Sequence, residues 1–283
     1  MSPDALPDPL GPCQLLYPLG SGGAGTVYLA RLVEDRPYGA AGTQVAVKVL
    51  DPECLESATV VRRFLREADV GRQVHHPSVV RTYDIGAAEA NGTRYHYLVL
   101  EYVEGRTLRE LMRELSSFPE PLLVDLAQQI ASGLEAIHAA GAAHRDLKPG
   151  NILITPDYQV KLMDLGVAFL IENSTRLTRE GYFVGTVLYA SPEQVRGEEV
   201  GPAADLYSLG VVLYEAATGV QPFEGASAQE SIQRQLTHNP PHAGDLNPQL
   251  TTWMEEVIAC LMAKDPEDRF SDATEVLAVL EHG

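Results

Sequence analysis

The sequence predicts an α+β chain in two parts, a small sheet-rich part up to about residue 103 and a larger helical part after it. In the first third, five short runs rich in Val, Tyr and Leu are separated by Gly, Pro or Asn, a pattern typical of strands. In the remaining two thirds, apolar residues recur at helical spacing. Hydrophobic residues make up 45% of the 283 residues, which is enough to bury a core in each part.

The first part is expected to hold five strands and one helix. The strands are the runs LLYPLG, TVYLARLV, QVAVKVL, VVRTYDIG and YHYLVLEYV. The helix follows Ser57, a residue type that caps helices. Its apolar positions, at helical spacing, are Val60, Val61, Phe64, Leu65 and Ala68. Residues 1–12 are rich in Pro and Asp, and we expect them to form a flexible leader.

The second part is expected to hold four longer helices. The first ends at Gly141 and carries the stripe Leu126, Ile130, Leu134 and Ile137. The others are DLYSLGVVLYEAATG, ended by Gly219, then TWMEEVIACLMAKD, ended by Pro266, and SDATEVLAVLEHG. Between the first two helices lie two short strands, NILI and QVKLM, and a long stretch with little periodicity from Asp164 to Glu193.

Charge and cysteine usage narrow the classes of function. With 21 Lys and Arg against 39 Asp and Glu, the formal net charge is −18, which argues against nucleic-acid binding because phosphate backbones need clustered cations. Cys13, Cys54 and Cys260 fit neither a disulfide framework nor a zinc site, so we expect reduced thiols in a cytoplasmic protein.

No run approaches the roughly 18 consecutive apolar residues of a membrane helix, and the first residues do not resemble a secretory signal. We therefore expect no membrane contact within this chain. A membrane anchor of a longer protein would lie in a segment not present here.

The glycine-rich run GSGGAGTV, residues 20–27, lies between two expected strands. Glycines at this spacing let backbone N–H groups approach a phosphate chain with no Cβ in the way. A plain hairpin turn explains the same pattern. A Rossmann site needs a helix directly after the glycines, and a P-loop needs a Lys before Thr26, and the sequence offers neither. A hairpin that covers phosphates remains open beside the plain turn.

Lys48 ends the apolar run VAVK, where a buried ammonium group requires a partner. A side chain that reaches back to water is the simpler explanation. Glu67, on the inward face of the expected helix, is the candidate partner. An ion pair between Lys48 and Glu67 would hold the ammonium where it can contact phosphate oxygens.

The run HRDLKPGN, residues 144–151, stands directly before the apolar run ILI. In such a loop Asp146 can act on a hydroxyl, Lys148 can stabilise a phosphoryl group, and Asn151 can offer an oxygen to a metal. Asp164 follows another apolar run, and its carboxylate with Asn151 supplies the hard oxygen donors that suit Mg²⁺. Taken singly, Asp146 could be a loop cap and Asp164 a turn residue. The occurrence of all these motifs in order favours the chemical interpretation.

Together these motifs resemble those of the eukaryotic-like bacterial Ser/Thr protein kinases. The resemblance covers about residues 14 to 280 and includes GSGGAGTV, VAVK, HRDLKPGN, DLG in place of DFG, GTVLYASPE and the DLYSLG helix. It implies a bilobal protein kinase fold, in which residues 13–280 form one kinase domain. Residues 13–103 would be the N-lobe, an antiparallel sheet with one key helix, and residues 104–283 the helical C-lobe.

The resemblance also implies function. It implies a protein serine/threonine kinase that uses ATP and Mg²⁺, with Mn²⁺ as an alternative, and that phosphorylates its own activation loop. It assigns catalytic roles to Asp146, Lys148, Lys48 and Glu67, and metal binding to Asn151 and Asp164. The residues assigned to ATP binding are Gly20, Ser21, Gly22, Gly23, Ala24, Gly25, Val27, Ala46, Lys48, Leu100, Glu101, Val103 and Leu153.

Arg145, next to Asp146, marks the subclass of such kinases that is activated by phosphorylation, and the candidate phosphorylation sites are Thr175 and Thr178. By the same resemblance, Thr186 shapes the groove for the protein substrate.

The resemblance assigns structural roles as well. Glu193 would pair with Arg269, and Asp205 would bind the backbone of the HRDLKPGN loop. The expected partners are proteins that bear Ser or Thr, and a weak homodimer through the small lobes is expected. Two alternatives stay open. One is a pseudokinase scaffold, which would have lost a catalytic residue, and the other is a small-molecule phosphotransferase of kinase-like fold, which would lack GTVLYASPE.

Overall fold

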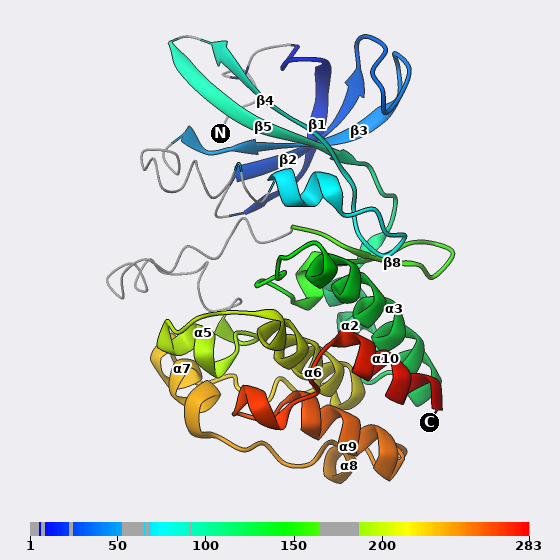
Figure 1. The fold of residues 1–283 in the computed structure, drawn as a ribbon, viewed down its shortest axis with the longest axis vertical. Coiled ribbons are helices and arrows are strands. Elements are labelled where there is room, and N and C mark those ends of the chain that lie inside the picture. Colours follow the sequence, from blue (N-terminus) through cyan, green and yellow to red (C-terminus); the bar gives the residue numbers. More distant parts are fainter. Residues whose placement is uncertain are drawn as a thin grey trace. The chain divides into compact units, whose positions relative to one another are not determined.

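The computed structural model describes residues 6, 9–22, 25–52, 65, 68–90, 92–164 and 187–282. The chain divides into two compact units, each with its own set of elements (Figure 1). The first unit comprises Met1–His76 and Val80–Glu104, and the second comprises Pro77–Val79 and Gly105–Gly283.

The first unit is built on a five-stranded sheet in the order β1-β2-β3-β5-β4, in which all neighbours are antiparallel. Its strands are β1 (Cys13–Gly22), β2 (Gly25–Leu32), β3 (Gln44–Leu50), β4 (Thr82–Ala90) and β5 (Thr93–Glu101). Each of the five predicted runs forms a strand. Strand β4 begins three residues later than its apolar run, because Val79 instead bridges to Leu162 in the second unit.

One face of this sheet carries the apolar core of the first unit. Val45, Val47 and Val49 of β3 all belong to that core, together with residues of β1, β2 and β5. Because side chains alternate along a strand, Ala46 and Lys48 lie on the opposite face. The sheet therefore separates a core face from a face that carries Lys48.

The chain between β2 and β3 folds back onto the sheet. Arg36 and Gly39 form a backbone bridge, and Tyr38 stacks on Tyr83 of β4 with ring centroids 5.0 Å apart. Tyr38 also packs against the core of the first unit. The segment between β2 and β3 therefore supplies an aromatic ring to this core.

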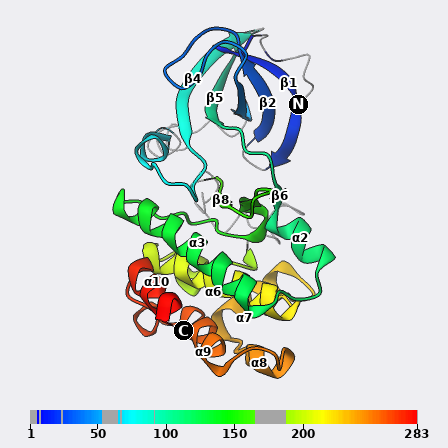
Figure 2. The ribbon, with the colours of Figure 1, turned by 90° about the vertical axis from the view of Figure 1, so that its right-hand side faces the viewer.

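The second unit is mainly helical (Figures 1 and 2). Its helices are α2 (Leu108–Glu114), α3 (Glu120–Ala139), α5 (Pro192–Arg196), α6 (Pro202–Thr218), α7 (Ala228–Thr237), α8 (Ala243–Leu246), α9 (Thr252–Leu261) and α10 (Ala273–His282). A small sheet joins β6 (Arg106–Thr107), β7 (Ile152–Ile154) and β8 (Val160–Leu162). The described residues of this unit also form the 3₁₀ turns η3 (Pro149–Asn151) and η4 (Pro266–Asp268).

Helix α6 is the buried centre of this unit, with every residue from Ala204 to Ala217 buried. A helix that is buried on all sides belongs in the interior, and α6 packs against both α3 and α9, while α10 covers another side of α3 (Figure 2). At Gly210 an added Cβ would lie 2.7 Å from the Cβ of Leu261, so glycine permits the close approach of α9. Helix α6 ends at Gly219, as predicted, where φ is 72°.

Helix α9 ends at Leu261, four residues earlier than the apolar pattern predicts. The carbonyls of Ala263 and Lys264 accept hydrogen bonds from the Arg269 side chain. These bonds to Arg269 stabilise the backbone here in place of a continued helix.

Among the described residues, no helix combines the length and apolar character that a membrane span requires. Cys13 and Cys260 are free thiols, and Cys54 lies outside the described residues.

Candidate active site

The loop that carries Asp146 is anchored by Asp205, a fully buried residue near the start of α6. The two carboxylate oxygens of Asp205 each accept a 2.7 Å hydrogen bond, from the backbone N–H groups of His144 and Arg145. His138 Nε2 lies 2.8 Å from the same carboxylate. Arg145 has a φ of 63°, a conformation that an ordinary residue rarely adopts. The buried carboxylate therefore stabilises the unusual backbone turn that stands directly before Asp146.

Within the loop, Asp146 is 6% exposed and is held by two neighbours. Lys148 Nζ lies 2.9 Å and 2.8 Å from its two carboxylate oxygens. Asn151 Nδ2 donates to the Asp146 backbone carbonyl at 2.8 Å and to its Oδ2 at 2.9 Å. The structure thus brings together three residues that the sequence singled out, and it fixes the direction of the Asp146 carboxylate.

The same contacts orient the expected metal donors. Because Asn151 Nδ2 is turned to Asp146, its Oδ1 is the oxygen that can face a cation. Ile152 pairs with Leu162 across β7 and β8, and the Met163 N–H donates to the Asn151 carbonyl at 2.9 Å. Asp164 is the next residue after Met163, which is bound to Asn151, and it has a left-handed conformation with φ of 57°.

Asn151 and Asp164 fit a hard divalent cation whose remaining coordination positions are open to ligands from outside the protein. An amide oxygen and a carboxylate are oxygen donors of the kind that Mg²⁺ takes. In the described part of the chain, no group of three or more His, Cys, Asp or Glu residues forms a metal cage. A cation held by Asn151 and Asp164 would therefore take its other ligands from phosphate and water.

In the first unit, predicted ATP-binding residues from three strands share one face. Val27 of β2 lies opposite Lys48 of β3, and Ala46 lies opposite Leu100 of β5. All four positions alternate with residues of the apolar core, so they lie on the other face of the sheet. Lys48 is 6% exposed there.

The glycine-rich run occupies the ends of β1 and β2. Gly20, Ser21 and Gly22 end β1, and Gly22 pairs with Gly25. Gly25 has a φ of 147°, and an added Cβ would lie 2.0 Å from the Val49 carbonyl oxygen, so only glycine fits. This position therefore requires glycine for the backbone, whatever the hairpin binds.

Three further predicted contacts have defined places. The N–H of Glu101, the last residue of β5, donates to the Arg81 carbonyl at 2.8 Å, and Val103 follows two residues later. Leu153 belongs to the second unit, on β7 opposite Thr107. Six predicted residues lie outside the described residues, namely Gly23, Ala24, Glu67, Thr175, Thr178 and Thr186.

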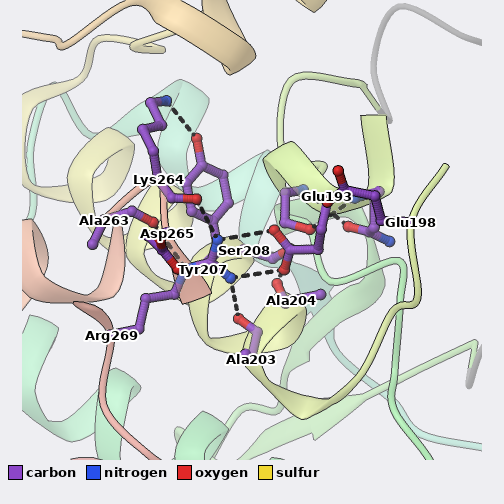
Figure 3. A network of polar contacts seen from close by, with 12 residues as sticks. Glu193, Glu198, Ala203, Ala204, Tyr207, Ser208, Ala263, Lys264, Asp265 and Arg269 are labelled. Carbon is purple, nitrogen blue, oxygen red and sulfur yellow. Dashed lines mark hydrogen bonds and ion pairs between the residues drawn. The ribbon is translucent and has the colours of Figure 1, made fainter. Parts of the chain in front are cut away.

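The expected pair of Glu193 and Arg269 is present and buried (Figure 3). Two parallel hydrogen bonds of 2.8 Å and 2.9 Å join the guanidinium to the carboxylate. The remaining guanidinium N–H groups donate to the carbonyls of Ala203, Ala263 and Lys264, so all five donors are used. Burial is the largest influence and raises the pKa of Glu193, but the hydrogen bonds and charge of Arg269, with hydrogen bonds from the Glu193 backbone and Ser191, together leave the pKa below its ordinary value.

Sequence reasoning missed two contacts near the catalytic loop. Gln194 Nε2 donates to the Arg145 carbonyl at 2.9 Å, while Gln194 also forms a capping box with Ser191. The S-x-x-Q spacing in SPEQ was an available signal for that box.

The second missed contact is a group of three residues, in which Tyr189 and Glu215 are buried and Arg109 is partly exposed. Tyr189 contacts both Glu215 and Arg109, and Arg109 Nη1 lies 2.7 Å from Glu215 Oε1. Burial raises the pKa of the Tyr189 hydroxyl above its ordinary value. No sequence signal could have joined residues so far apart.

Comparisons with known proteins bear on the family of this chain. The family described as "Protein kinase domain" matches residues 14–282. The chain is 39% identical over 264 residues to serine/threonine-protein kinases drp72 of Corynebacterium efficiens, which covers 93% of this chain and 49% of that protein. It is 36% identical over 262 residues to serine/threonine-protein kinase PknB of Mycobacterium leprae, covering 93% of this chain and 41% of that protein. The chain thus spans about half, or less, of these relatives.

Solved structures show the same fold. The kinase domain of Mycobacterium tuberculosis PknI superposes with a TM-score of 0.73 at 23% identity, covering 98% of this chain and 97% of that one. The predicted two-part fold, with an antiparallel-sheet lobe and a helical lobe, is thereby confirmed. With a family match over nearly its whole length, this chain belongs to the protein kinase domain family.

Proposed function

We propose that this chain is an ATP-dependent protein serine/threonine kinase that uses Mg²⁺, with Mn²⁺ as an alternative metal. The observation that carries the proposal is the catalytic loop, in which Lys148 and Asn151 both bind Asp146. Asp205 anchors the backbone of the same loop. Phosphoryl transfer through a loose transition state needs position and charge neutralisation more than covalent chemistry, and this loop supplies both.

In this proposal each residue has one task. Asp146 accepts a hydrogen bond from the Ser or Thr hydroxyl of the substrate and aims its oxygen at the γ-phosphorus. Lys148 neutralises charge on the phosphoryl group as it moves. Asn151 Oδ1 and the Asp164 carboxylate would hold Mg²⁺, which when bound neutralises phosphate charge.

The first unit would bind the nucleotide. Lys48, paired with Glu67, would position the α- and β-phosphates, and the glycine-rich hairpin would cover them. Val27, Ala46 and Leu100 share the face of the sheet that carries Lys48, which supports their role in contacting the adenine ring. Leu153, Glu101 and Val103 are assigned to the same ring.

The proposal includes phosphorylation of the activation loop at Thr175 or Thr178. Arg145 donates to the Val200 carbonyl across 3.3 Å, a long contact that a phosphate would readily replace as a charged partner. We also propose that the substrates are proteins and that the domain lies in the cytoplasm. A weak homodimer remains a prediction. Leu16, Tyr17 and Leu19 on β1 are exposed apolar side chains that support such a contact.

The test is intact-mass spectrometry after incubation with Mg²⁺ and ATP, followed by mapping of the modified residues. We expect added phosphate on Ser or Thr, with Thr175 or Thr178 among the sites. In a double variant with Thr175→Ala and Thr178→Ala, the phosphate at these two positions is expected to be lost. ATP binding without any phosphoryl transfer in Mg²⁺ or Mn²⁺ would instead indicate a pseudokinase. Phosphate found on an amino sugar or alcohol, and none on protein, would indicate a small-molecule phosphotransferase.

A further inference from the structure

Two glutamine side chains fix the backbone directly after Thr186. Gln235 Nε2, on α7, donates to the carbonyls of Val187 at 3.1 Å and Leu188 at 2.7 Å. Gln221 Nε2, between α6 and α7, donates to the Leu188 carbonyl at 2.8 Å. Val187 and Leu188 are themselves buried. The path of this segment is therefore set by amide groups that come from other elements.

The orientation of the Gln235 amide is itself determined by its neighbours. Gln235 is fully buried, and its Oε1 accepts a 2.6 Å hydrogen bond from the Tyr207 hydroxyl. Because the oxygen is used in this way, the nitrogen faces the two backbone carbonyls. Lys264 Nζ in turn donates to the Tyr207 hydroxyl at 2.9 Å (Figure 3). One directional chain of hydrogen bonds thus runs from the Lys264 ammonium to the backbone after Thr186.

Aromatic rings surround Lys264, at the far end of this series of hydrogen bonds. The Lys264 ammonium lies 4.0 Å from the centroid of the Phe223 ring and 5.3 Å from that of Tyr207. Tyr207 belongs to the buried centre of α6 and lies under the guanidinium of Arg269 as well. The donor that directs Tyr207 therefore sits in a fixed aromatic setting.

We propose that Gln235 is a positioning residue for the protein substrate. It holds the Val187 and Leu188 backbone in the groove where the substrate chain binds, and Tyr207 and Lys264 hold Gln235. The inference rests on the proposed function, since the groove is assigned through the kinase resemblance of GTVLYASPE.

The amide chemistry of Gln235 suggests two variants that separate hydrogen bonding from side-chain volume. Gln235→Leu keeps the volume but removes one donor from each of the Val187 and Leu188 carbonyls, which still accept from Ala190 and Gln221, and it removes the acceptor of the Tyr207 hydroxyl. Gln235→Glu keeps the shape and the bond from Tyr207, but it turns an oxygen toward the carbonyl oxygens. If the amide N–H groups of Gln235 position the substrate groove, both variants bind the protein substrate more weakly. If only side-chain volume matters, both variants are tolerated.

The experiment is steady-state kinetics of phosphoryl transfer from ATP to a basic test protein. Gln235→Leu and Gln235→Glu are expected to raise KM for the protein about tenfold, while kcat changes by less than about twofold. KM for ATP is expected to stay at the wild-type value, which a general loss of structure would not allow. The matched control is Gln233→Leu, the same change at an exposed position of α7, which leaves KM for the protein unchanged.

A second variant covers the case in which the Gln235 variants do not fold. Tyr207→Phe removes only the hydroxyl that orients Gln235, and it is expected to raise KM for the protein about threefold. Folded variants with a wild-type KM for the protein would overturn the inference, as would equal losses for ATP and protein. A wild-type chain that transfers no phosphate to protein would overturn the proposed function itself, and the inference with it.

Discussion

Asp205 is fully buried, yet both of its carboxylate oxygens accept hydrogen bonds from the backbone of the catalytic loop. A buried carboxylate is costly unless it is bonded in this way. The loop and the centre of α6 therefore depend on each other, and the direction of Asp146 depends on both. At this scale, a buried polar side chain positions backbone groups of a distant segment, and the same holds for Gln235.

Lys264 gives a prediction about pH. Burial, and then the charges of Arg269 and Arg196, lower the pKa of Lys264 from 10.5 to about 8. Between these values the unfolded chain binds more protons than the folded chain, so this group makes the free energy of unfolding rise as pH rises through that window. The destabilising effect of the charged amine is fully present below pH 8 and is gone above pH 10.5.

The measurement is urea unfolding of wild type and Lys264→Met at several pH values from below 8 to 10.5. Other titrating groups act on both proteins alike, so the difference between them isolates Lys264. We expect the wild type to gain stability relative to the variant as pH rises. Parallel pH profiles would show that Lys264 has an ordinary pKa in the folded chain.

The sequence could place residues that lie close together in the chain. Asp146, Lys148 and Asn151 fall within six positions, so their grouping follows from one short loop. Gln235 could not be placed in this way, because 48 and 47 positions separate it from Val187 and Leu188, and only tertiary packing joins them.

Among the elements, those with a long apolar period could be predicted and those without one could not. The five strands of the first unit and helices α3, α6 and α10 agree with their patterns. Helices α2, α5 and α8 have seven, five and four residues, too few to show a period. Helix α7 has ten, but its buried residues are Ser231 and Gln235, so its inward face is polar and gives no hydrophobic signal.

Arg269 gives the prediction at the element scale, because it joins α5, the start of α6 and the turn after α9. Arg269→Met removes the charged partner of the buried Glu193 carboxylate and the donors that Arg269 gives to the carbonyls of Ala203, Ala263 and Lys264. We expect the free energy of unfolding to fall by about 3–5 kcal/mol.

The control is Arg234→Met, which breaks an ion pair with Glu230 whose side chains are 39% and 41% exposed. That change is expected to cost less than about 1 kcal/mol. Urea unfolding of both variants decides the matter. Similar losses in the two would mean that the buried bidentate pair does not hold these elements together.

For the whole molecule, the net charge of −18 bears on the choice of substrate. An acidic surface attracts basic segments and repels acidic ones, and it speeds the encounter most at low salt. A basic test protein is therefore the suitable first substrate. The family and the two-part fold could be predicted because ordered motifs span both units. The details of the groove could not, because they depend on packing between distant segments.

The central claim is that Asp146, set by Lys148, Asn151 and Asp205, serves phosphoryl transfer. The most direct measurement is transfer of radiolabelled γ-phosphate from ATP to a basic test protein by wild type, Asp146→Asn and Asp157→Asn. Asp157 is an exposed carboxylate in the turn between β7 and β8, so it receives the same change outside the site. We predict a loss of about 10²- to 10⁴-fold in kcat for Asp146→Asn and an unchanged rate for Asp157→Asn. Full activity of a folded Asp146→Asn variant would contradict the account.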